Sequence, residues 1–352
     1  MTDVIRVDPD RPDATAMARA ADCLRRGGLV AFPTETVYGL GVHALDPEAV
    51  RRLFAAKGRP ANDPLIVHVD SLDRVHDLVL HVPETAVALA ARFWPGPLTL
   101  VLPRSSRVPD EVTAGLNTVA VRVPAHPVAR ALLTAAAVPV AAPSANLFSR
   151  PSPTRASHVL DDLNGRIDLV IDGGPTNVGV ESTVLDLSGD VPTILRPGAI
   201  SLEMLQMILP RVERRASTEH GRSAMPSPGM LDRHYSPRAP LTLYEGDARA
   251  TVARLVRDAC AATAAGARVG IMAAEEDREA LADLAPAGAR VTIAYLGSEH
   301  DLATVAARLY TVMRELDSAG VDRILVRAFP GEDGLASAIQ DRLRRARVRP
   351  GG

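Results

Sequence analysis

The last third of the chain places the strongest constraint on its fold, because short apolar runs alternate there with helix-length segments. The apolar runs lie at residues 241–244, 269–272, 291–295 and 323–327. The helix-length segments lie at residues 249–264, 277–284, 302–316 and 335–344. Such alternation is typical of a parallel sheet covered by helices. The sequence therefore predicts a smaller, Rossmann-like parallel α/β domain at residues 241–352.

The preceding domain, residues 1–210, also reads as α/β, but polar side chains follow its apolar strands. Strands are predicted at residues 29–32, 65–69, 98–102, 119–123, 138–142, 169–171, 184–187 and 193–195. Open α/β sheets bind ligands at the ends of their strands, so we expect the functional site in this domain. Residues 211–240 are rich in Arg, Ser, Pro and Gly and poor in aliphatic residues, which predicts a linker.

Composition argues against several classes of protein. The 352 residues carry a net charge of −2 and 3% aromatic residues, which disfavours a nucleic-acid-binding surface. Cys23 and Cys260 lie far apart without Cys or His companions, so neither a zinc site nor a disulfide framework is predicted. The charged segment 1–13 lacks the apolar core of a signal peptide, and no apolar run is long enough to span a membrane. We expect a soluble, cytoplasmic protein.

The basic residues are unusual in type, because Lys57 is the only lysine among the 40 lysines and arginines of the chain. It opens the cationic segment Lys57–Pro64, between a predicted helix and a predicted strand. An ammonium is more compact than a guanidinium and approaches a single phosphate oxygen differently, which favours a functional role. A surface lysine present by chance is the alternative. A second segment, Pro33–Gly41, is rich in hydroxyls and glycines and predicts a ligand-contacting turn.

The sequence lacks the motifs of the common nucleotide-binding and hydrolase sites. Lys57 is followed by glycine, which excludes a Walker A motif, and Gly39–Gly41 has no third glycine at the dinucleotide spacing. The remaining candidates are single polar residues: Lys57, Arg59, His68, Arg122, Ser144, Asn146, Ser182 and Arg196. Cations with hydroxyl and amide donors suit a ligand that carries several phosphates. Thr34, His68 and Arg122 suit a smaller partner with a carboxylate.

Each of these residues also has a purely structural interpretation. His68 on a strand could be a packing histidine, and Arg122 between valines could be an edge-strand cation. Ser144 and Asn146 could cap the turn after a strand. Arg196 could pair with a nearby acid. Only the combination of these residues points to a binding site.

Taken together, the motifs are similar to those of a known family. Residues 14–200 resemble the YrdC/Sua5 family of threonylcarbamoyl-adenylate synthases, whose motif pairs Lys-x-Arg with Ser-x-Asn. The matching segments are Lys57–Arg59, Ser144–Asn146, Phe32–Leu40, Pro64–His68, Trp94–Thr99, Val121–Pro124, Glu181–Thr183 and Leu195–Gly198. Residues 227–237 resemble the linker of the longer Sua5 branch, and the segment beyond them resembles its C-terminal domain.

The resemblance implies a fold, an activity and a set of site residues. The fold is a YrdC-like twisted open mixed sheet with helices. The activity joins L-threonine, bicarbonate and ATP, with Mg²⁺ accompanying ATP, into threonylcarbamoyl-adenylate for the t6A modification at position 37 of tRNA. Threonine would bind at Thr34, His68, Arg122, Ala142 and Ser182. ATP would bind at Lys57, Asn62, Thr118, Ser144, Asn146, Ser152, Arg196 and Tyr235. Lys57 and Arg59 would be catalytic.

The resemblance also implies partners. The product would pass to the tRNA threonylcarbamoyl-transfer machinery, without stable binding of tRNA by this chain. The linker would act as a lid, with Tyr235 folding over the nucleotide. One departure is Leu231, which follows Met230 where the family commonly has lysine; Arg233 is a candidate substitute.

Two other functions compete with this interpretation. The related carbamoyltransferase of hydrogenase maturation carries an acylphosphatase module and Cys-rich zinc fingers, which two isolated cysteines exclude here. A non-catalytic module that binds double-stranded RNA or associates with the ribosome is the alternative from another class. The low net charge and the scarcity of aromatic residues argue against it.

Overall fold

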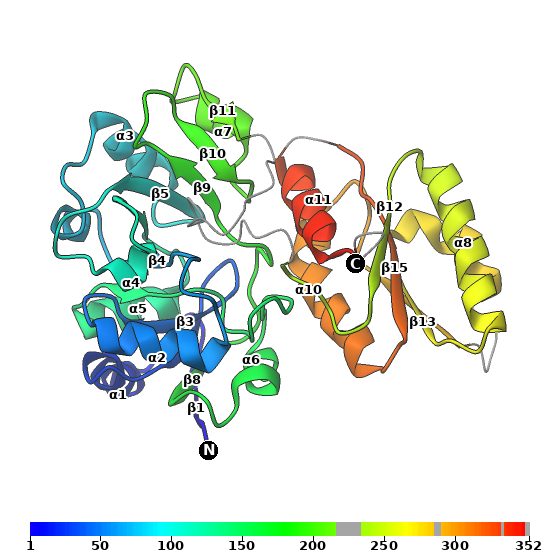
Figure 1. Cartoon of the computed structure of the whole chain (residues 1–352), viewed down its shortest axis with the longest axis horizontal. Helices are drawn as coiled ribbons and strands as arrows, with labels where there is room; N and C mark the ends of the chain where they lie inside the picture. Colours follow the sequence, from blue (N-terminus) through cyan, green and yellow to red (C-terminus); the bar gives the residue numbers. More distant parts are fainter. Residues whose placement is uncertain (216–233, 285–289, 332–333, 349–352) are drawn as a thin grey trace. The chain divides into compact units, whose positions relative to one another are not determined.

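The computed structural model describes residues 1–215, 234–284, 290–331 and 334–348 (Figure 1). They form two compact units. The first contains residues 1–148 and continues from residue 152. The second contains residues 149–151 together with the described residues from 234 onward. Of the expected linker, residues 216–233, which include Leu231 and Arg233, lie outside the described residues.

The first unit is built on one mixed sheet in the order β1-β8-β2-β3-β7-β4-β6-β5-β9-β10-β11. The strands are β1 (Asp3–Arg6), β2 (Val30–Pro33), β3 (Tyr38–His43), β4 (Ile66–His68), β5 (Leu98–Pro103), β6 (Thr118–Arg122), β7 (Val140–Ala141), β8 (Leu169–Asp172), β9 (Thr183–Asp186), β10 (Thr193–Arg196) and β11 (Glu213–Arg214). Parallel pairs such as β4–β6 and β5–β9 are mixed with antiparallel pairs such as β5–β6 and β3–β7. The expected mixed α/β sheet is confirmed.

Helices surround this sheet, and their caps follow from the sequence. They are α1 (Ala14–Arg25), α2 (Pro47–Lys57), α3 (Glu84–Phe93), α4 (Asp110–Thr113), α5 (Pro127–Ala136), α6 (Ala156–Leu163) and α7 (Leu202–Gln206), with a 3-10 helix at Asp73–Asp77. The carboxylate of Asp46 accepts hydrogen bonds from two amides in the first turn of α2, and Pro47 occupies its first position. Gly58 ends α2 with φ of 63°, a left-handed conformation that favours glycine. These caps make Lys57 the last residue of the helix.

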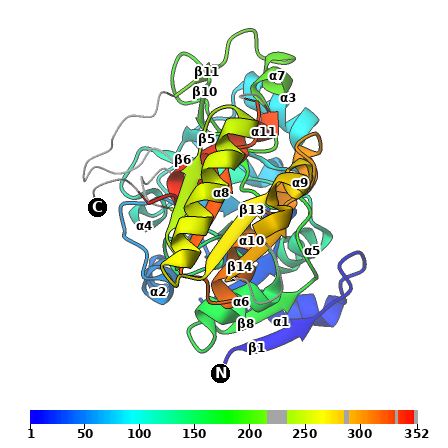
Figure 2. The same ribbon diagram turned by 90° about the vertical axis from the view of Figure 1, so that its right-hand side faces the viewer.

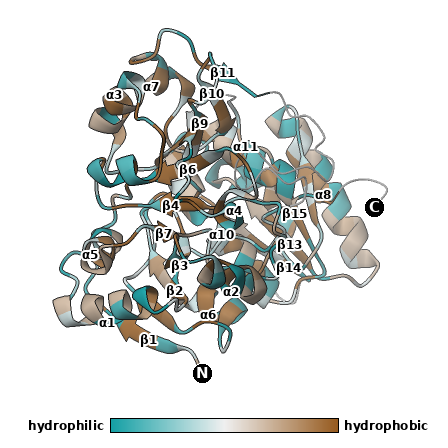
Figure 3. Cartoon of the chain, turned by 60° about the vertical axis from the view of Figure 1, so that its left-hand side comes forward, coloured by the Kyte–Doolittle hydropathy of each residue, from teal (hydrophilic) through white to brown (hydrophobic). Residues whose placement is uncertain are grey.

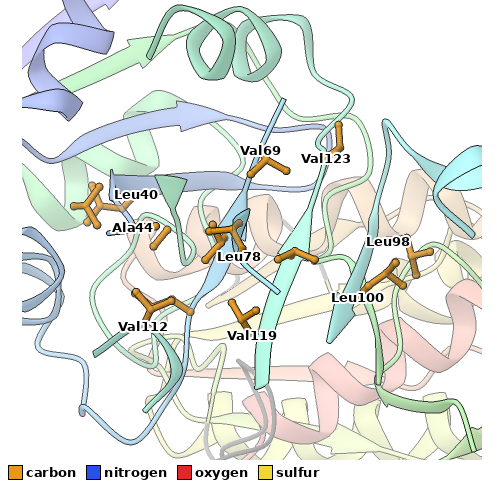
Figure 4. Packing of buried hydrophobic residues seen from close by; sticks show 14 of the residues in the cluster. Leu40, Ala44, Val69, Leu78, Leu98, Leu100, Val112, Val119 and Val123 are labelled. Carbon is orange, nitrogen blue, oxygen red and sulfur yellow. The ribbon is translucent and has the colours of Figure 1, made fainter. Parts of the chain in front are cut away.

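Alternation along the strands separates the apolar clusters on the two faces of the sheet, and two of these clusters are large. Leu98 and Leu100 of β5 and Val119 of β6 enter the larger core, together with Leu40 and Val112 (Figure 4). The strands are largely brown in the hydropathy view, whereas α2 carries hydrophilic residues on its outside (Figure 3). The second core lies on the opposite face of the sheet and packs Phe32 and Val140 against α1 and α5. The neighbours of the core residues along each strand, Thr99 on β5 and Arg122 on β6, therefore face away from the larger core.

The largest difference from the sequence-based expectation is β3. The segment Pro33–Gly41 was expected to be a turn, but its second half pairs antiparallel with β2. Glycine in a strand weakens the strand pattern in the sequence, and here it has a packing role. A Cβ atom on Gly41 would lie 2.8 Å from both Phe32 Cε1 and Val140 Cγ1, so only glycine leaves room for these side chains.

The second unit confirms the predicted parallel domain. Its strands β12 (Leu241–Tyr244), β13 (Val269–Ala273), β14 (Val291–Tyr295) and β15 (Arg323–Arg327) pair in parallel in the order β12-β15-β13-β14. The helices are α8 (Ala248–Ala264), α9 (Arg278–Leu281), α10 (Leu302–Ser318) and α11 (Gly334–Ala346), with 3-10 turns at Glu275–Asp277 and Ala282–Leu284. Helix α8 covers one face of this sheet, and α10 and α11 cover the other (Figures 1 and 2). Among the described helices of both units, none combines the length and the apolar character that a membrane crossing requires.

Candidate active site

Lys57 is buried and holds the loop that follows β7. Its side chain is 2% exposed, and Nζ donates hydrogen bonds of 2.6 Å to the carbonyl oxygens of Ser144 and Asn146. The carbonyl of Lys57 accepts from the amide of Phe148 at 2.9 Å. Burial, followed by the nearby Arg59 charge, lowers the pKa of Lys57 well below its ordinary value. In its protonated form the Lys57 side chain is an ammonium with three donors, so one N–H remains for a ligand. The structure therefore unites the Lys-x-Arg and Ser-x-Asn motifs.

The polar contacts described for Arg59 all lie within its own loop. Its guanidinium lies 2.9 Å from the Asp63 carboxylate and donates to the carbonyl oxygens of Asp63 and Pro64 at 3.2 and 2.8 Å. These contacts fix the loop that carries Asn62, whose buried Oδ1 has no hydrogen-bond partner among the described residues. The geometry gives Arg59 a positioning role, and its expected catalytic role stays a prediction.

Arg122 is held by three contacts at the end of β6. Nη2 donates to Glu35 Oε1 at 2.6 Å, Nη1 to Thr36 Oγ1 at 3.1 Å, and Nε to the carbonyl of Gly96 at 3.1 Å. The other Glu35 oxygen accepts from the amide of Ala125 at 3.0 Å. A guanidinium has five N–H donors, so two remain for a ligand. This is a buried, oriented and charge-balanced cation, which a carboxylate can approach with two hydrogen bonds.

Thr34 is committed to its own turn. Its hydroxyl donates to the carbonyl of Val37 at 2.6 Å, because a carbonyl can only accept. The hydroxyl of Thr36, 2.8 Å away, must therefore donate to Thr34 Oγ1, while Thr36 Oγ1 accepts from Arg122. The result is a chain of hydrogen bonds with fixed direction from Arg122 to Val37. Thr36 is a site residue that the sequence analysis missed.

His68 lies beside Arg122 in the register of β4 and β6. It is 3% exposed, its ring packs edge-to-face against Phe32 with centroids 6.4 Å apart, and its Nδ1 has no partner among the described residues. Burial, and then the charge of Arg122, lowers the pKa of His68 to about 3. A neutral imidazole with a vacant buried nitrogen suits hydrogen bonding to a ligand. The amide of Ala142 donates to the carbonyl of Ile66 at 2.9 Å, which places Ala142 next to the same strand.

Ser182 and Arg196 form a second buried pair. The Arg196 guanidinium donates to the carbonyl oxygen of Ser182 from Nε and Nη2, at 3.1 and 3.0 Å, and Nη2 also donates to Ser182 Oγ at 3.1 Å. Ser152 Oγ donates to Glu181 Oε1 at 2.5 Å, so the residue before Ser182 is fixed as well. Glu181 is another buried acid whose role the sequence alone did not reveal.

Thr118 and Tyr235 are the remaining two predicted site residues. Thr118 opens β6, which Arg122 ends, so strand geometry separates their Cα atoms by about 13 Å. Their expected assignment to different ligands stays a prediction. Tyr235 belongs to the second unit, where it is fully buried, with φ of 60°. Its ring lies 5.5 Å from that of Tyr310 and 5.4 Å from the Arg342 guanidinium carbon. Its role as a lid stays a prediction.

Comparisons with known proteins identify the family of the chain. Residues 22–198 match the Sua5/YciO/YrdC family, which carries the description "Telomere recombination", and residues 200–347 match the C-terminal domain of threonylcarbamoyl-AMP synthase. The chain is 43% identical to the threonylcarbamoyl-AMP synthase of Bacillus subtilis over 94% of this chain and 92% of that protein. It is also 43% identical to the Pyrococcus abyssi enzyme of the same name, over 98% of each chain.

Solved structures extend the similarity to the fold. The crystal structure of Pyrococcus abyssi Sua5 complexed with L-threonine matches with a TM-score of 0.90 and 42% identity, over 98% of this chain and 97% of that one. Both domains of that family are thus present in this chain, in the same order. The chain belongs to the YrdC/Sua5 family of threonylcarbamoyl-AMP synthases, in its longer form with the Sua5 C-terminal domain.

Proposed function

We propose that the protein joins L-threonine, bicarbonate and ATP into L-threonylcarbamoyladenylate and releases pyrophosphate, as a step toward t6A37 in tRNA. The observation with the most weight is the near-complete coverage by relatives named threonylcarbamoyl-AMP synthase. A second support is a solved relative that binds L-threonine. The product would pass to a protein that transfers the threonylcarbamoyl group to tRNA.

The proposed chemistry needs no covalent intermediate with the protein. The threonine amine attacks the carbon of bicarbonate and forms a carbamate, with loss of water. A carbamate oxygen then attacks the α-phosphorus of ATP, and the bond to the bridging oxygen of the β-phosphate breaks, which releases pyrophosphate. Buried donors that are already oriented favour such a reaction by positioning the reactants and by stabilising charge on the phosphates.

We assign the two clusters to the two larger substrates. The two free N–H groups of Arg122 would bind the threonine carboxylate, with His68 and Ser182 completing that pocket and Thr34 and Ala142 forming its wall. The free N–H of Lys57 would bind a phosphate oxygen. Asn62, Thr118, Ser144, Asn146, Ser152 and Arg196 would complete the ATP site.

Mg²⁺ would enter with ATP. The described residues contain no group of three or more His, Cys, Asp or Glu side chains arranged to hold a metal. The carboxylates of Glu35, Asp63 and Glu181 are occupied by Arg122, Arg59 and Ser152, respectively. Mg²⁺ is commonly bound by substrate phosphates, water and few protein ligands, and the residues present fit that mode.

The test is an assay of pyrophosphate release in which L-threonine, bicarbonate and ATP are omitted in turn. We expect turnover only with all three, because the carbamate is the nucleophile. L-Serine should be a poorer substrate, because one methyl group in a fitted pocket is worth about 1–3 kcal/mol. Turnover that persists after depletion of bicarbonate would contradict the chemistry. Salt-sensitive retention of double-stranded RNA without any turnover would instead favour a non-catalytic RNA-binding role.

A further inference from the structure

Thr99, a buried residue on the site face of the sheet, has no part in the roles assigned so far, although its hydroxyl contacts that of Ser182. Thr99 lies on β5 and is 0% exposed, and Ser182, just before β9, is 1% exposed. Their Oγ atoms are 2.7 Å apart. Strands β5 and β9 pair in parallel, with Thr99 opposite Val184. This register places Thr99 near Ser182, which directly precedes β9, so the sheet fixes the contact. Because Leu98 and Leu100 enter the larger core, Thr99 faces the side that carries Arg122.

The direction of this hydrogen bond follows from counting donors. If Ser182 donated to Thr99, the buried Thr99 proton would have no acceptor, because Thr99 makes no other hydrogen bond with the described residues. A buried donor without an acceptor is costly, and in the opposite direction the remaining Ser182 proton has an acceptor in the ligand that the proposed function places at Ser182, so we assign Thr99 as the donor. Ser182 Oγ then accepts from both Thr99 and Arg196, which occupies its two lone pairs. The remaining capacity of Ser182 is its own O–H.

We propose that Thr99 is a positioning residue that makes Ser182 an obligate hydrogen-bond donor to the ligand. The inference rests on the proposed function, in which Ser182 binds L-threonine. With both lone pairs occupied, Ser182 can offer only a proton, and Arg196 beside it offers only N–H groups. This corner of the site therefore selects an acceptor oxygen, such as a carboxylate oxygen of L-threonine, and disfavours an ammonium group.

The experiment measures L-threonine affinity by isothermal titration calorimetry on the full chain. Thr99→Val keeps the size and removes the donor, and we expect the dissociation constant to rise about tenfold, which corresponds to 1.4 kcal/mol. Thr99→Ser should stay within about threefold of the wild type. If Thr99→Val lowers the stability of the protein, the affinities of Thr99→Ala and Thr99→Ser are compared instead. These two variants both lack the γ-methyl group and differ only in the hydroxyl. The isosteric control is Thr113→Val, because Thr113 is also buried and its hydroxyl has no partner among the described residues.

A double-mutant cycle separates positioning from a general loss of structure. If Thr99 acts through Ser182, then Thr99→Val should cost no further affinity in a Ser182→Ala background. Unchanged affinity in Thr99→Val, or losses that add up in the double mutant, would overturn the inference while the wild type still binds L-threonine. Absence of binding by the wild type itself would overturn the proposed function, and this inference with it.

Discussion

At Lys57, burial changes what a substitution is expected to do. A surface lysine present by chance was the alternative that the sequence left open, but the side chain is 2% exposed, with Nζ between two carbonyl oxygens. Lys57→Arg keeps the charge and forces a wider guanidinium into this space. We expect at least a tenfold loss in kcat/KM, about 1.4 kcal/mol. We also expect a lower melting temperature, because overpacking a buried position costs about 1–3 kcal/mol.

Steady-state kinetics with varied ATP and thermal unfolding check this prediction. Arg52→Lys is the control, since it makes the reverse exchange on the exposed side of the same helix. A lower kcat would indicate that Lys57 stabilises charge that develops during the reaction. A higher KM for ATP with unchanged kcat would indicate that Lys57 only binds ATP. Wild-type kinetics in purified Lys57→Arg would show that lysine at this position is an accident of composition.

His68 predicts a pH dependence of stability. Its pKa is about 3 in the folded protein and near 6.5 when unfolded. Below pH 6.5 the unfolded chain binds a proton that the folded chain does not, so stability falls as the pH decreases from 6.5 toward 3. In His68→Asn this contribution disappears, so its free energy of unfolding should depend less on pH between 6.5 and 4.5. Urea titrations at several pH values measure the difference, with the exposed His76→Asn as control; identical slopes for wild type and His68→Asn would contradict the assignment.

At the scale of elements, the local pattern of apolar and polar residues predicted most helices and strands. It failed where glycines interrupt the pattern or where a segment becomes a strand only because a distant strand pairs with it. Helix α2 is read from Asp46, Pro47 and Gly58, whose roles are local. Strand β3 was missed because Gly39 and Gly41 remove the apolar alternation. Strands β1 and β11 and helices α6 and α7 also carried too little periodicity to be predicted.

The same limit applies to the site. Cations and hydroxyls such as Lys57 and Ser144 were visible in the sequence because their residue types are informative. Glu35 and Thr36, which contact Arg122, and Thr99, which contacts Ser182, were not visible, because those contacts depend on sheet register and on residues that are distant along the chain. A buried carboxylate always needs a partner, but sequence alone does not say which carboxylates are buried.

Gly198 tests how the turn before β9 holds Ser182. A Cβ atom here would lie 2.3 Å from the Thr183 amide nitrogen and 2.7 Å from the carbonyl oxygen of Glu181, and backbone atoms cannot yield as flexible side chains do. Gly198→Ala should therefore displace this turn, raise the dissociation constant for L-threonine at least tenfold and lower the melting temperature. Gly189→Ala is the matched control, since nothing lies within 4 Å of its Cβ position. Wild-type affinity in Gly198→Ala would show that the turn does not determine binding.

At the scale of the whole molecule, the chain enters the second unit twice. Residues 149–151 belong to that unit although Phe148 and Ser152 on either side belong to the first. Within the second unit, the amide of Ser236 donates to the carbonyl of Ser149 at 2.7 Å, and Arg314 Nη2 donates to the carbonyl of Pro151 at 2.6 Å. The short segment thus continues directly from the loop that Lys57 holds, and it is fastened by residues more than 80 positions away.

Asp317, at the end of α10, also contacts the segment of residues 149–151 and links it to residues 238 and 239. Its carboxylate, 3% exposed, accepts from the Arg150 guanidinium at 3.3 Å and from the amides of Arg238 and Ala239 at 2.8 and 3.1 Å. Asp317→Asn keeps the shape but replaces one acceptor oxygen by a donor, so at least one of these hydrogen bonds must be lost. We expect faster hydrogen exchange at residues 238 and 239, by tenfold or more.

The same substitution tests whether the second unit supports the nucleotide site. Residues 149–151 lie between the proposed ATP-binding residues Asn146 and Ser152, so loosening them should raise KM for ATP severalfold and leave KM for L-threonine within about twofold. Glu315→Gln on the same helix is the matched control, because it removes an exposed charge that makes no hydrogen bond with the described residues. Equal rises in both Michaelis constants would indicate a general loss of structure. Faster exchange with unchanged KM for ATP would show that this segment is fastened for stability alone, because the nucleotide site then keeps its geometry when the anchor is weakened.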